Sequence, residues 1–315
     1  MEKNRIEITR YTPNRAQEWD NTVDESRNGT FLIKRNYLDY HSHRFVDHSL
    51  IFEMDGVIIA LLPANEEGTT LYSHQGLTYG GLIMTSRCKG LVVLHIFDII
   101  KQYMQEQGFK ELIYKPIPHI YHKKPAEEDI YALFRNGAKV EFCGISSTIN
   151  LAEEVQFSSL RSRGIKRAIA NGLTVKEELD FVEFWDILKD NLNQRHSVNP
   201  VHSLDEIELL KKRFPENIHL FSAYKNSELV AGVLMYETSV CAHSQYIASS
   251  PIGREFGALD LIFSYLIKER YKDVKYFDFG ISTENGGLHL NEGLLSQKEG
   301  FGASATVYPI YKLTI

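Results

Sequence analysis

Cysteine is scarce in this 315-residue sequence. Its three cysteines, Cys88, Cys143 and Cys241, are odd in number, lie far apart and form no Cys-x-x-Cys pair. This pattern argues against a disulfide framework and a zinc knuckle, and it favours a reducing, cytoplasmic location. The twelve histidines include no His-x-x-x-His or His-Glu-x-x-His pair, so we expect no metal site.

Excess positive charge and long apolar runs are also lacking. Lys and Arg number 35 against 41 Asp and Glu, a net charge of −6, so we expect neither a surface dominated by phosphate contacts nor a DNA partner. The most apolar run, residues 91–100, contains His95 and Asp98 and is too short to span a bilayer. The first ten residues are charged throughout, and we expect neither a signal peptide nor membrane insertion.

The chain has enough apolar residues to form a packed interior. Apolar residues make up 43% and charged residues 24% of the chain, which is typical of a globular protein and not of a disordered one. A length of 315 residues predicts about two domains.

One order of elements occurs twice. Three β-runs, a loop with glycines, a helix, a strand, a helix and a strand are predicted at residues 49–54, 57–63, 70–75, 76–90, 91–107, 111–114, 127–135 and 139–149. The order recurs at residues 219–225, 229–237, 240–248, 249–257, 258–271, 276–281, 290–299 and 305–313. This predicts an α/β fold with a mixed α+β sheet, built as two tandem units (1–154 and 155–315) packed as one body. Two unrelated α+β domains that share an element order by chance are the alternative.

A basic stretch separates the two repeats. Residues 155–176 contain no acidic residue and five basic ones: Arg161, Arg163, Lys166, Arg167 and Lys176. The apolar spacing predicts an amphipathic helix over residues 158–171 that opens the second unit. The stretch is either a solvated helix face, a surface that holds phosphates of a donor or acceptor, or a nucleic-acid-binding face.

Four short strings carry a resemblance to a known family. They are Arg163-Gly-Ile-Lys-Arg-Ala-Ile-Ala-Asn-Gly172, Asn193-Gln-Arg-His196, Asp278-Phe-Gly-Ile-Ser282 and Gln297-Lys-Glu-Gly-Phe-Gly302. With the doubled element order, they resemble the duplicated GNAT fold of the FemAB-type transferases. Those relatives transfer an aminoacyl group from charged tRNA to peptidoglycan precursors, and similar proteins of the wider superfamily use acetyl-CoA.

The resemblance implies an acyltransferase that acts on an amine, or less readily a hydroxyl, of a cell-envelope sugar or peptide precursor. Acetyl-CoA and aminoacyl-tRNA both stay open as the donor. The expected partners are a small-molecule or nucleotide-linked precursor and, for the second donor, tRNA. The second unit is expected to bind the donor and the first to shape the acceptor site. A non-catalytic module of the same fold that binds an envelope precursor is the alternative.

Gly253, Arg254 and Gly257 lie between a predicted strand and a predicted helix. Free backbone N–H groups and the positive end of a helix dipole can hold a donor phosphate at such a point. Glycines also occur in strand-to-helix loops that bind nothing, so a purely structural role is the alternative. The other donor candidates are residues of the basic helix: Arg163, Lys166 and Arg167.

Acyl transfer needs a base for the amine and a group that stabilises the oxyanion. Lys298 lies in the segment where FemAB-like enzymes place a lysine proposed to contact the acyl ester; a solvent-facing lysine near a helix end is the other reading. Asp278 ends a predicted strand and can take the amine proton or cap the next turn. Glu237, His243 and Tyr246 are further acid/base candidates, and strict alternation places the last two on opposite faces of their strand.

The candidates for acceptor binding come from both halves of the chain: His74, Gln75, Tyr79, Arg195 and His196. Most of the 17 Tyr and 17 Phe must be packing residues, so no further aromatic side chain is assigned to a site.

Overall fold

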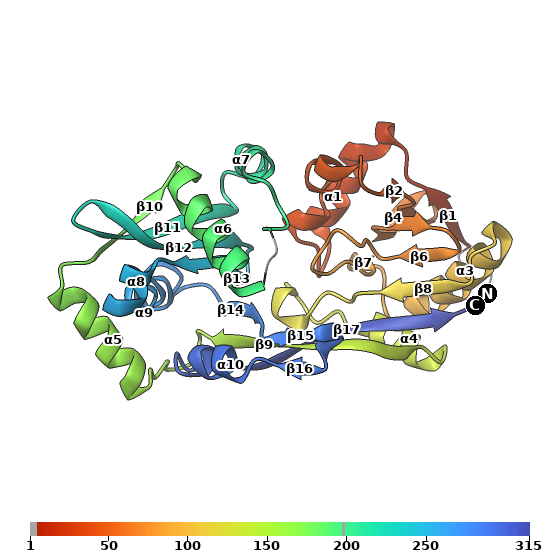
Figure 1. The fold of residues 1–315 in the computed structure, drawn as a ribbon. Coiled ribbons are helices and arrows are strands. Elements are labelled where there is room, and N and C mark those ends of the chain that lie inside the picture. Colours follow the sequence, from red (N-terminus) through yellow and green to blue (C-terminus); the bar gives the residue numbers. More distant parts are fainter. Residues whose placement is uncertain (1–4, 197–198) are drawn as a thin grey trace. The chain divides into compact units, whose positions relative to one another are not determined.

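The computed structural model describes residues 5–196 and 199–315, without the side chains of Arg195 and His196. Contacts divide the chain into two compact units: Met1–Gly144 with Gly286–Leu288 and Val307–Ile315, and Ile145–Asn285 with His289–Thr306. Each unit combines helices with parallel and antiparallel strand pairs, which confirms the α/β class (Figure 1). The repeat boundary at 154/155 stays a prediction, whereas contacts assign the last strand to the first unit.

The first unit contains two sets of strands. One is antiparallel, in the order β1 (Ile6–Arg10), β3 (Leu50–Met54), β4 (Val57–Leu62) and β7 (Ile83–Met84). The other runs β17 (Ser304–Thr314), β8 (Glu111–Tyr114), β6 (Thr70–Tyr72), β5 (Asn65–Glu67) and β2 (Val46–Asp47), and its β6–β8 pair is parallel. The helices are α1 (Ala16–Glu25), α2 (Arg35–Leu38), α3 (Gly90–Gln107) and α4 (Glu128–Arg135).

The longest helix of the first unit forms where the apolar spacing predicts it. On α3, the buried residues Val93, Ile96, Phe97, Ile100 and Met104 recur every three or four positions and join the core beneath the antiparallel strands. The helix ends at Gln107, where the predicted range ends, and the following Gly108 closes the last turn with a φ of 79°. The core of this unit therefore follows from the sequence pattern.

A buried carboxyl lies at the start of α4. Asp129 is 3% exposed, and its Oδ2 accepts a hydrogen bond from the Tyr114 hydroxyl at 2.6 Å. The same hydroxyl accepts the Leu82 backbone N–H at 2.6 Å. Burial raises the pKa of Asp129 to about 7, against the opposing effect of the Tyr114 hydrogen bond. The folded state therefore holds a proton on Asp129 that the unfolded chain releases near its ordinary pKa of 3.8.

We expect the Asp129 carboxyl to make the first unit less stable as pH rises from about 4 to about 7, because the folded state binds more protons in this interval. The shift corresponds to about 4 kcal/mol of unfolding free energy, lost completely above pH 7. Asp129→Asn, which keeps an acceptor for Tyr114, removes this term. Urea unfolding followed by Trp19 fluorescence, in a Trp185→Phe background, should show the Asn variant gaining on the parent as pH rises. A pH-independent difference between the two proteins would contradict this prediction.

The main sheet of the second unit mixes both strand directions, and β15 (Thr283–Glu284) and β16 (His289–Leu290) form a separate antiparallel pair. The order in the main sheet is β10 (Thr174–Glu178), β11 (Ile218–Lys225), β12 (Glu228–Glu237), β13 (Cys241–Ser249), β14 (Tyr276–Ile281) and β9 (Lys139–Asn150), which enters from the first unit. The helices are α5 (Ser159–Ala170), α6 (Val182–His196), α7 (Leu204–Arg213), α8 (Pro251–Phe256), α9 (Ala258–Tyr265) and α10 (Glu292–Glu299). Within the described residues, no helix has the length and apolarity needed to cross a membrane.

Helices pack on both faces of this sheet (Figure 1). Val233 and Met235 of β12 join a core cluster with Ile262 of α9, which defines the α9 face. Gly232 lies on the other face, where an added Cβ would approach the Phe184 ring of α6 to 2.4 Å. This is the α6 face, and β12 permits the close approach of α6 because glycine has no side chain.

Candidate active site

Strands β13 and β14 of the second unit are parallel and pair only briefly. The pairing joins Cys241–His243 to Tyr276–Asp278, although β13 continues to Ser249 and β14 to Ile281. Beyond the last pair, His243 with Asp278, the two strands no longer share backbone pairing. Polar side chains at this point therefore lie where the sheet opens.

A β-bulge lies on β13 just beyond this point. Leu234 of β12 pairs with Tyr246, but the next residue, Met235, pairs with Ser244. Gln245 is therefore an extra residue on β13, and a bulge of this kind shifts the alternation of side chains by one.

The bulge brings two candidate acid/base residues to one face. Tyr246 lies opposite Leu234, and His243 lies opposite Tyr236. Leu234 and Tyr236 alternate with the residues of the α9 face, so both side chains lie on the α6 face. The Tyr246 ring indeed packs edge-on against Trp185 of α6, with centroids 5.4 Å apart. The prediction that His243 and Tyr246 lie on opposite faces is wrong, because one inserted residue interrupts strict alternation.

His243 and Asp278 form an imidazole–carboxylate pair. Asp278 is fully buried, and its Oδ2 lies 2.8 Å from His243 Nδ1. Its Oδ1 accepts hydrogen bonds from Ser146 Oγ at 2.6 Å and Thr148 Oγ1 at 2.9 Å, both on β9. With Asp278 ionised, Nδ1 of His243 donates, and the lone pair belongs to Nε2, on the opposite side of the ring from Nδ1. The carboxylate thus orients the imidazole.

Tyr246 has a histidine partner. Its hydroxyl lies 2.7 Å from His202 Nδ1 and accepts the His202 backbone N–H at 3.3 Å. Burial raises the pKa of Tyr246 above its ordinary value. The hydroxyl therefore keeps its proton at neutral pH and can act as a hydrogen-bond donor or a general acid.

Lys298 reaches the end of β14 from α10. It is 4% exposed, and its ammonium donates to the carbonyls of Gly280 and Ile281 at 2.8 and 3.0 Å and to Ser282 Oγ at 3.0 Å. Burial lowers the pKa of Lys298 to about 8, with Asp278 opposing the shift. The solvent-facing alternative is therefore wrong for this lysine: the ammonium binds the segment that follows Asp278.

Glu237 lies apart from these groups. It pairs with Ala242 across β12 and β13, on the α9 face, and its carboxylate accepts from Arg270 at 3.1 Å. His219 Nε2 lies 3.8 Å from the same carboxylate. The structure does not bring Glu237 together with His243 and Asp278.

The predicted phosphate-binding glycines are used in packing. Gly253 lies inside α8, where its N–H donates to Ser250 Oγ at 3.1 Å and an added Cβ would come 2.2 Å from the Val230 carbonyl. Gly257 has a φ of 77°, and its Cβ would come 2.7 Å from the Gly164 carbonyl of α5. These contacts explain both glycines without a ligand, and donor binding by either stays a prediction.

The basic candidates remain on the surface of the second unit. Arg163, Lys166 and Arg167 are exposed on α5, and the predicted helix over 158–171 is present there. Arg161 instead pairs with Asp260 of α9 at 2.6 Å. The exposed Arg254 donates from Nη1 to the Ser249 carbonyl at 2.6 Å.

The acceptor candidates of the first unit lie after β6. His74 and Tyr79 are both 3% exposed, and the Tyr79 hydroxyl donates to Thr30 Oγ1 at 3.1 Å. Gln75 is held by hydrogen bonds to Asn65 and Glu67. Arg195 and His196 end α6, but their side chains lie outside the described part of the chain. Within residues 5–194 and 199–315, no group of three His, Cys, Asp or Glu side chains is arranged to hold a metal ion.

Comparison with known proteins agrees with this arrangement. Residues 159–285 match the acetyltransferase (GNAT) domain family. The crystal structure of FemX is 12% identical, with 98% of this chain and 97% of that chain covered and a TM-score of 0.69. The chain has a FemAB-like duplicated GNAT fold.

Two further solved structures share this duplicated GNAT fold. The L-PGS of Bacillus licheniformis is 15% identical over 96% of this chain and 92% of its own, with a TM-score of 0.62. The C-terminal domain of a putative lysylphosphatidylglycerol synthetase from Agrobacterium fabrum is 12% identical over 96% and 91%, with a TM-score of 0.60. No curated protein matches the sequence significantly. At these identities the likeness establishes the fold.

Sequence reasoning named His243 and Asp278 but did not join them. They are 35 residues apart, on strands separated by helices α8 and α9. Ser146 and Thr148, which complete the network, were missed because hydroxyl residues in a strand carry no pattern of their own. A histidine and an aspartate on successive parallel strands are the one signal that links the central pair.

Proposed function

We propose that this protein is an acyltransferase that moves an acetyl or aminoacyl group to an amine, with His243 as the general base. The observation that carries the proposal is the His243–Asp278 pair at the point where β13 and β14 stop pairing. The match of residues 159–285 to the acetyltransferase (GNAT) domain family supports it. Asp278 is a positioning residue in this scheme, since its two oxygens bind Ser146, Thr148 and His243.

In the proposed reaction, Nε2 of His243 takes a proton from the acceptor amine as its nitrogen attacks the acyl carbonyl carbon. A C–N bond forms, and the carbonyl electron pair moves to oxygen. Collapse of this intermediate breaks the C–S bond of a thioester donor or the C–O bond of an aminoacyl ester. Tyr246 is the candidate acid that returns a proton to the leaving group, because burial keeps its hydroxyl protonated.

Two groups are candidates for stabilising the oxyanion. The bulged Gln245 is an extra residue in its strand pair, and its backbone N–H is the first candidate. The Lys298 ammonium is the second candidate. It already donates hydrogen bonds to Gly280, Ile281 and Ser282, so it would stabilise the oxyanion through its charge. It could donate a hydrogen bond to the oxyanion only by giving up one of these three bonds.

The donor and acceptor stay open within this proposal. Arg163, Lys166, Arg167 and Arg254 are the candidates for donor phosphates, because all four are exposed. A cell-envelope sugar or peptide precursor is favoured as acceptor by the resemblance to FemAB-type transferases. The structural neighbour named as a lysylphosphatidylglycerol synthetase agrees with an envelope substrate. We place the reaction in the cytoplasm, where both donors occur.

The first test is calorimetric titration with acetyl-CoA, free CoA and an aminoacyl-tRNA mixture, followed by transfer of a radiolabelled acyl group to glucosamine and to a lysine-containing peptide. Micromolar binding of one donor, with label appearing on an amine, is the expected result. Binding of acetyl-CoA would direct the search to amino-sugar acceptors, and binding of charged tRNA to peptidoglycan-type acceptors. Absence of binding by both donors would contradict the proposal.

A non-catalytic module that binds an envelope precursor is the second candidate. The packing of Gly253 favours this alternative, because packing alone explains a glycine that was expected to bind the donor. Its N–H already donates to Ser250 Oγ, and an added Cβ would collide with the Val230 carbonyl. Precursor binding without any donor binding would decide for this alternative.

A further inference from the structure

His74 carries two energetic costs at one position. Its φ of 72° is in the left-handed region, and among the described residues it is the one buried non-glycine residue with a positive φ. Its ring is 3% exposed, and Nδ1 has no hydrogen-bond partner within the described part of the chain. A left-handed histidine and an unsatisfied buried nitrogen each cost about 1–3 kcal/mol. Such strain is retained where a site requires it.

The loop around His74 is held in this conformation from outside. The Lys115 ammonium donates to the carbonyls of His74, Gln75 and Leu77 at 3.4, 3.1 and 3.0 Å. Asn65 accepts the Gln75 backbone N–H at 2.7 Å and donates to the Gln75 side chain at 2.6 Å. None of these bonds engages the imidazole, so the loop is held in place without using the hydrogen-bonding groups of the ring.

Aromatic rings surround the imidazole. The His41 ring stacks on His74 with centroids 5.2 Å apart, and Tyr40 stacks on His41 at 4.2 Å. Phe45 meets His74 edge-on at 5.4 Å. Tyr40 and Phe45 are only partly buried, so part of each side chain is open to a ligand. We call Tyr40, His41, Phe45 and His74, with Asp47, the His74 site.

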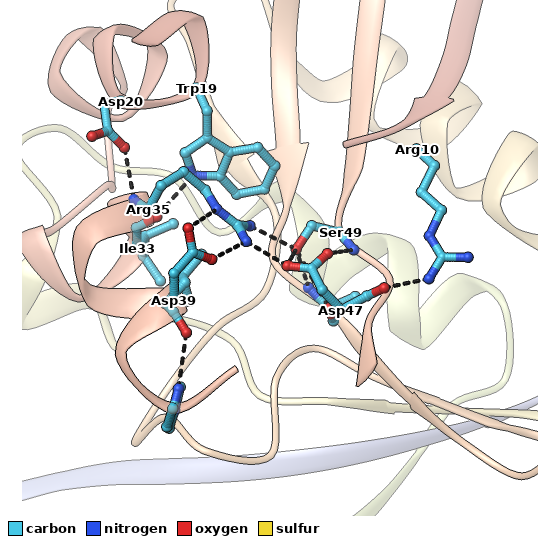
Figure 2. Close-up of polar contacts among 11 residues, drawn as sticks. Arg10, Trp19, Asp20, Ile33, Arg35, Asp39, Asp47 and Ser49 are labelled. Atoms are coloured by element: carbon cyan, nitrogen blue, oxygen red, sulfur yellow. Dashed lines mark hydrogen bonds and ion pairs between the residues drawn. The ribbon is translucent and has the colours of Figure 1, made fainter. Parts of the chain in front are cut away.

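Carboxylates and cations both lie beside this site. Figure 2 shows the guanidinium of Arg35 between the carboxylates of Asp39 and Asp47 and beside Ser49. Arg35 is 5% exposed and lies 3.8 Å over the Tyr11 ring centroid, whereas the side chains of Asp39 and Asp47 are 47% and 33% exposed. The carboxylates of Asp39 and Asp47 provide acceptors for hydroxyl groups, while the two neighbouring cations are already engaged: Arg35 by these carboxylates and Lys115 by the loop carbonyls.

The imidazole itself is neutral. Burial, followed by the neighbouring His41, lowers the pKa of His74 to about 3, against the effect of Asp47. A neutral imidazole offers one N–H donor and one acceptor nitrogen, which together suit a hydroxyl group. It offers no charge to a phosphate or a carboxylate.

We propose that the His74 site binds an uncharged, hydroxyl-bearing ring, that is, a sugar, through a hydrogen bond between the His74 imidazole and a ligand hydroxyl. The partly exposed rings of Tyr40 and Phe45 provide apolar surface for the C–H face of the sugar. This inference goes beyond the proposed function, because the site lies within the first unit. Sugar binding there requires neither a donor nor a transfer step.

Ligand-observed NMR titration with N-acetylglucosamine and glucose as probes tests this site, with inorganic phosphate for comparison. The wild-type protein is expected to bind at least one sugar, and His74→Asn, which tolerates a positive φ, to bind it about tenfold more weakly or worse. In protein labelled with ¹⁵N-histidine, the His74 ring resonances should move on addition of sugar. The melting temperature of His74→Asn should not fall, because the substitution removes strain.

His122→Asn is the matched control. His122 is also a buried histidine of the first unit, 8% exposed, and its Nδ1 likewise has no partner among the described residues, but its Nε2 is bonded to the Ile117 carbonyl at 2.8 Å and its φ is an ordinary −76°. Sugar affinity within about twofold of wild type is expected for this variant. If His74→Asn fails to fold, His74→Gly, which adopts positive φ freely, takes its place.

The inference is overturned by any of three results: neither sugar binds the wild-type protein, the His74 variant binds as well as the wild type, or phosphate binds and the sugars do not. His243→Gln is expected to bind the sugars normally. Failure of acyl transfer and failure of the His74 site are therefore distinguishable.

Discussion

Replacing His243 by glutamine is expected to lower kcat for acyl transfer about 100- to 10,000-fold, the range for loss of a general base. The glutamine amide can still donate to Asp278 Oδ2, which now accepts from His243 Nδ1 at 2.8 Å. It cannot accept a proton at neutral pH. Initial rates at saturating donor and acceptor measure the effect, and unchanged melting temperature shows that the fold is retained.

His219→Gln is the control for this substitution. His219 also lies on a strand of the second unit beside a carboxylate, with Nδ1 at 2.7 Å from Glu177 Oε1. It pairs with Met235, on the α9 face, away from Tyr246 and His243. We expect its kcat to match the wild type. A folded His243→Gln protein with full turnover would remove His243 as the base.

Asp278→Asn separates positioning from proton transfer. The Asp278 carboxylate accepts the hydrogen bond that holds Nδ1 of His243. Without that carboxylate, kcat should fall while KM changes little, because the imidazole is no longer held for proton transfer. A loss of activity that appears in KM, or together with a lower melting temperature, would indicate a purely structural role for Asp278.

The largest stability effect in the second unit is expected from Gly253→Ala in α8. The new Cβ would lie 2.2 Å from the Val230 carbonyl and 2.5 Å from Ser249 Oγ. Because Val230 presents backbone, α8 must move away from β12, and we expect a loss of about 1–3 kcal/mol of unfolding free energy. Urea unfolding followed by Trp185 fluorescence, in a Trp19→Phe background, reports on the second unit.

Gly293→Ala is the matched control in the same unit. It lies in α10, where the nearest atom to an added Cβ is Asn291 Oδ1 at 3.8 Å. There we expect a gain of about 0.5–1 kcal/mol, because alanine favours the helix more than glycine does. If Gly253→Ala instead kept full stability and lost donor affinity, Gly253 would belong to the donor site as the sequence predicts.

The order of elements in both halves could be predicted because it depends on local periodicity. The predicted helix over residues 91–107 is α3, and the predicted strand over residues 240–248 is β13. The predicted helix over residues 258–271 is α9 with a π-helical turn at Leu266–Arg270. Strands as short as β2, Val46–Asp47, were missed because two residues contain no period.

The candidate site was predicted in part. Residue chemistry selected Asp278 and Tyr246, and the resemblance to FemAB-type transferases selected Lys298; all three lie on or beside β13 and β14. The partnership of Asp278 with His243 could not be predicted, because it depends on strand register to a single residue. Strand register also explains why Glu237 does not lie near His243 and Asp278: its side chain is on the opposite face of its strand.

The sequence by itself determined the α/β class, the doubled order of elements and the basic helix, since spacing and composition act between neighbours in the chain. Only the tertiary structure decided which side chains meet. One extra residue at Gln245 sets Tyr246 beside His243 on one face, and the early end of the β13–β14 pairing places Asp278 there. The left-handed backbone of His74, after β6, is held by Lys115, which follows β8. Such contacts join distant residues, so their geometry follows from packing of the whole unit and not from local preference.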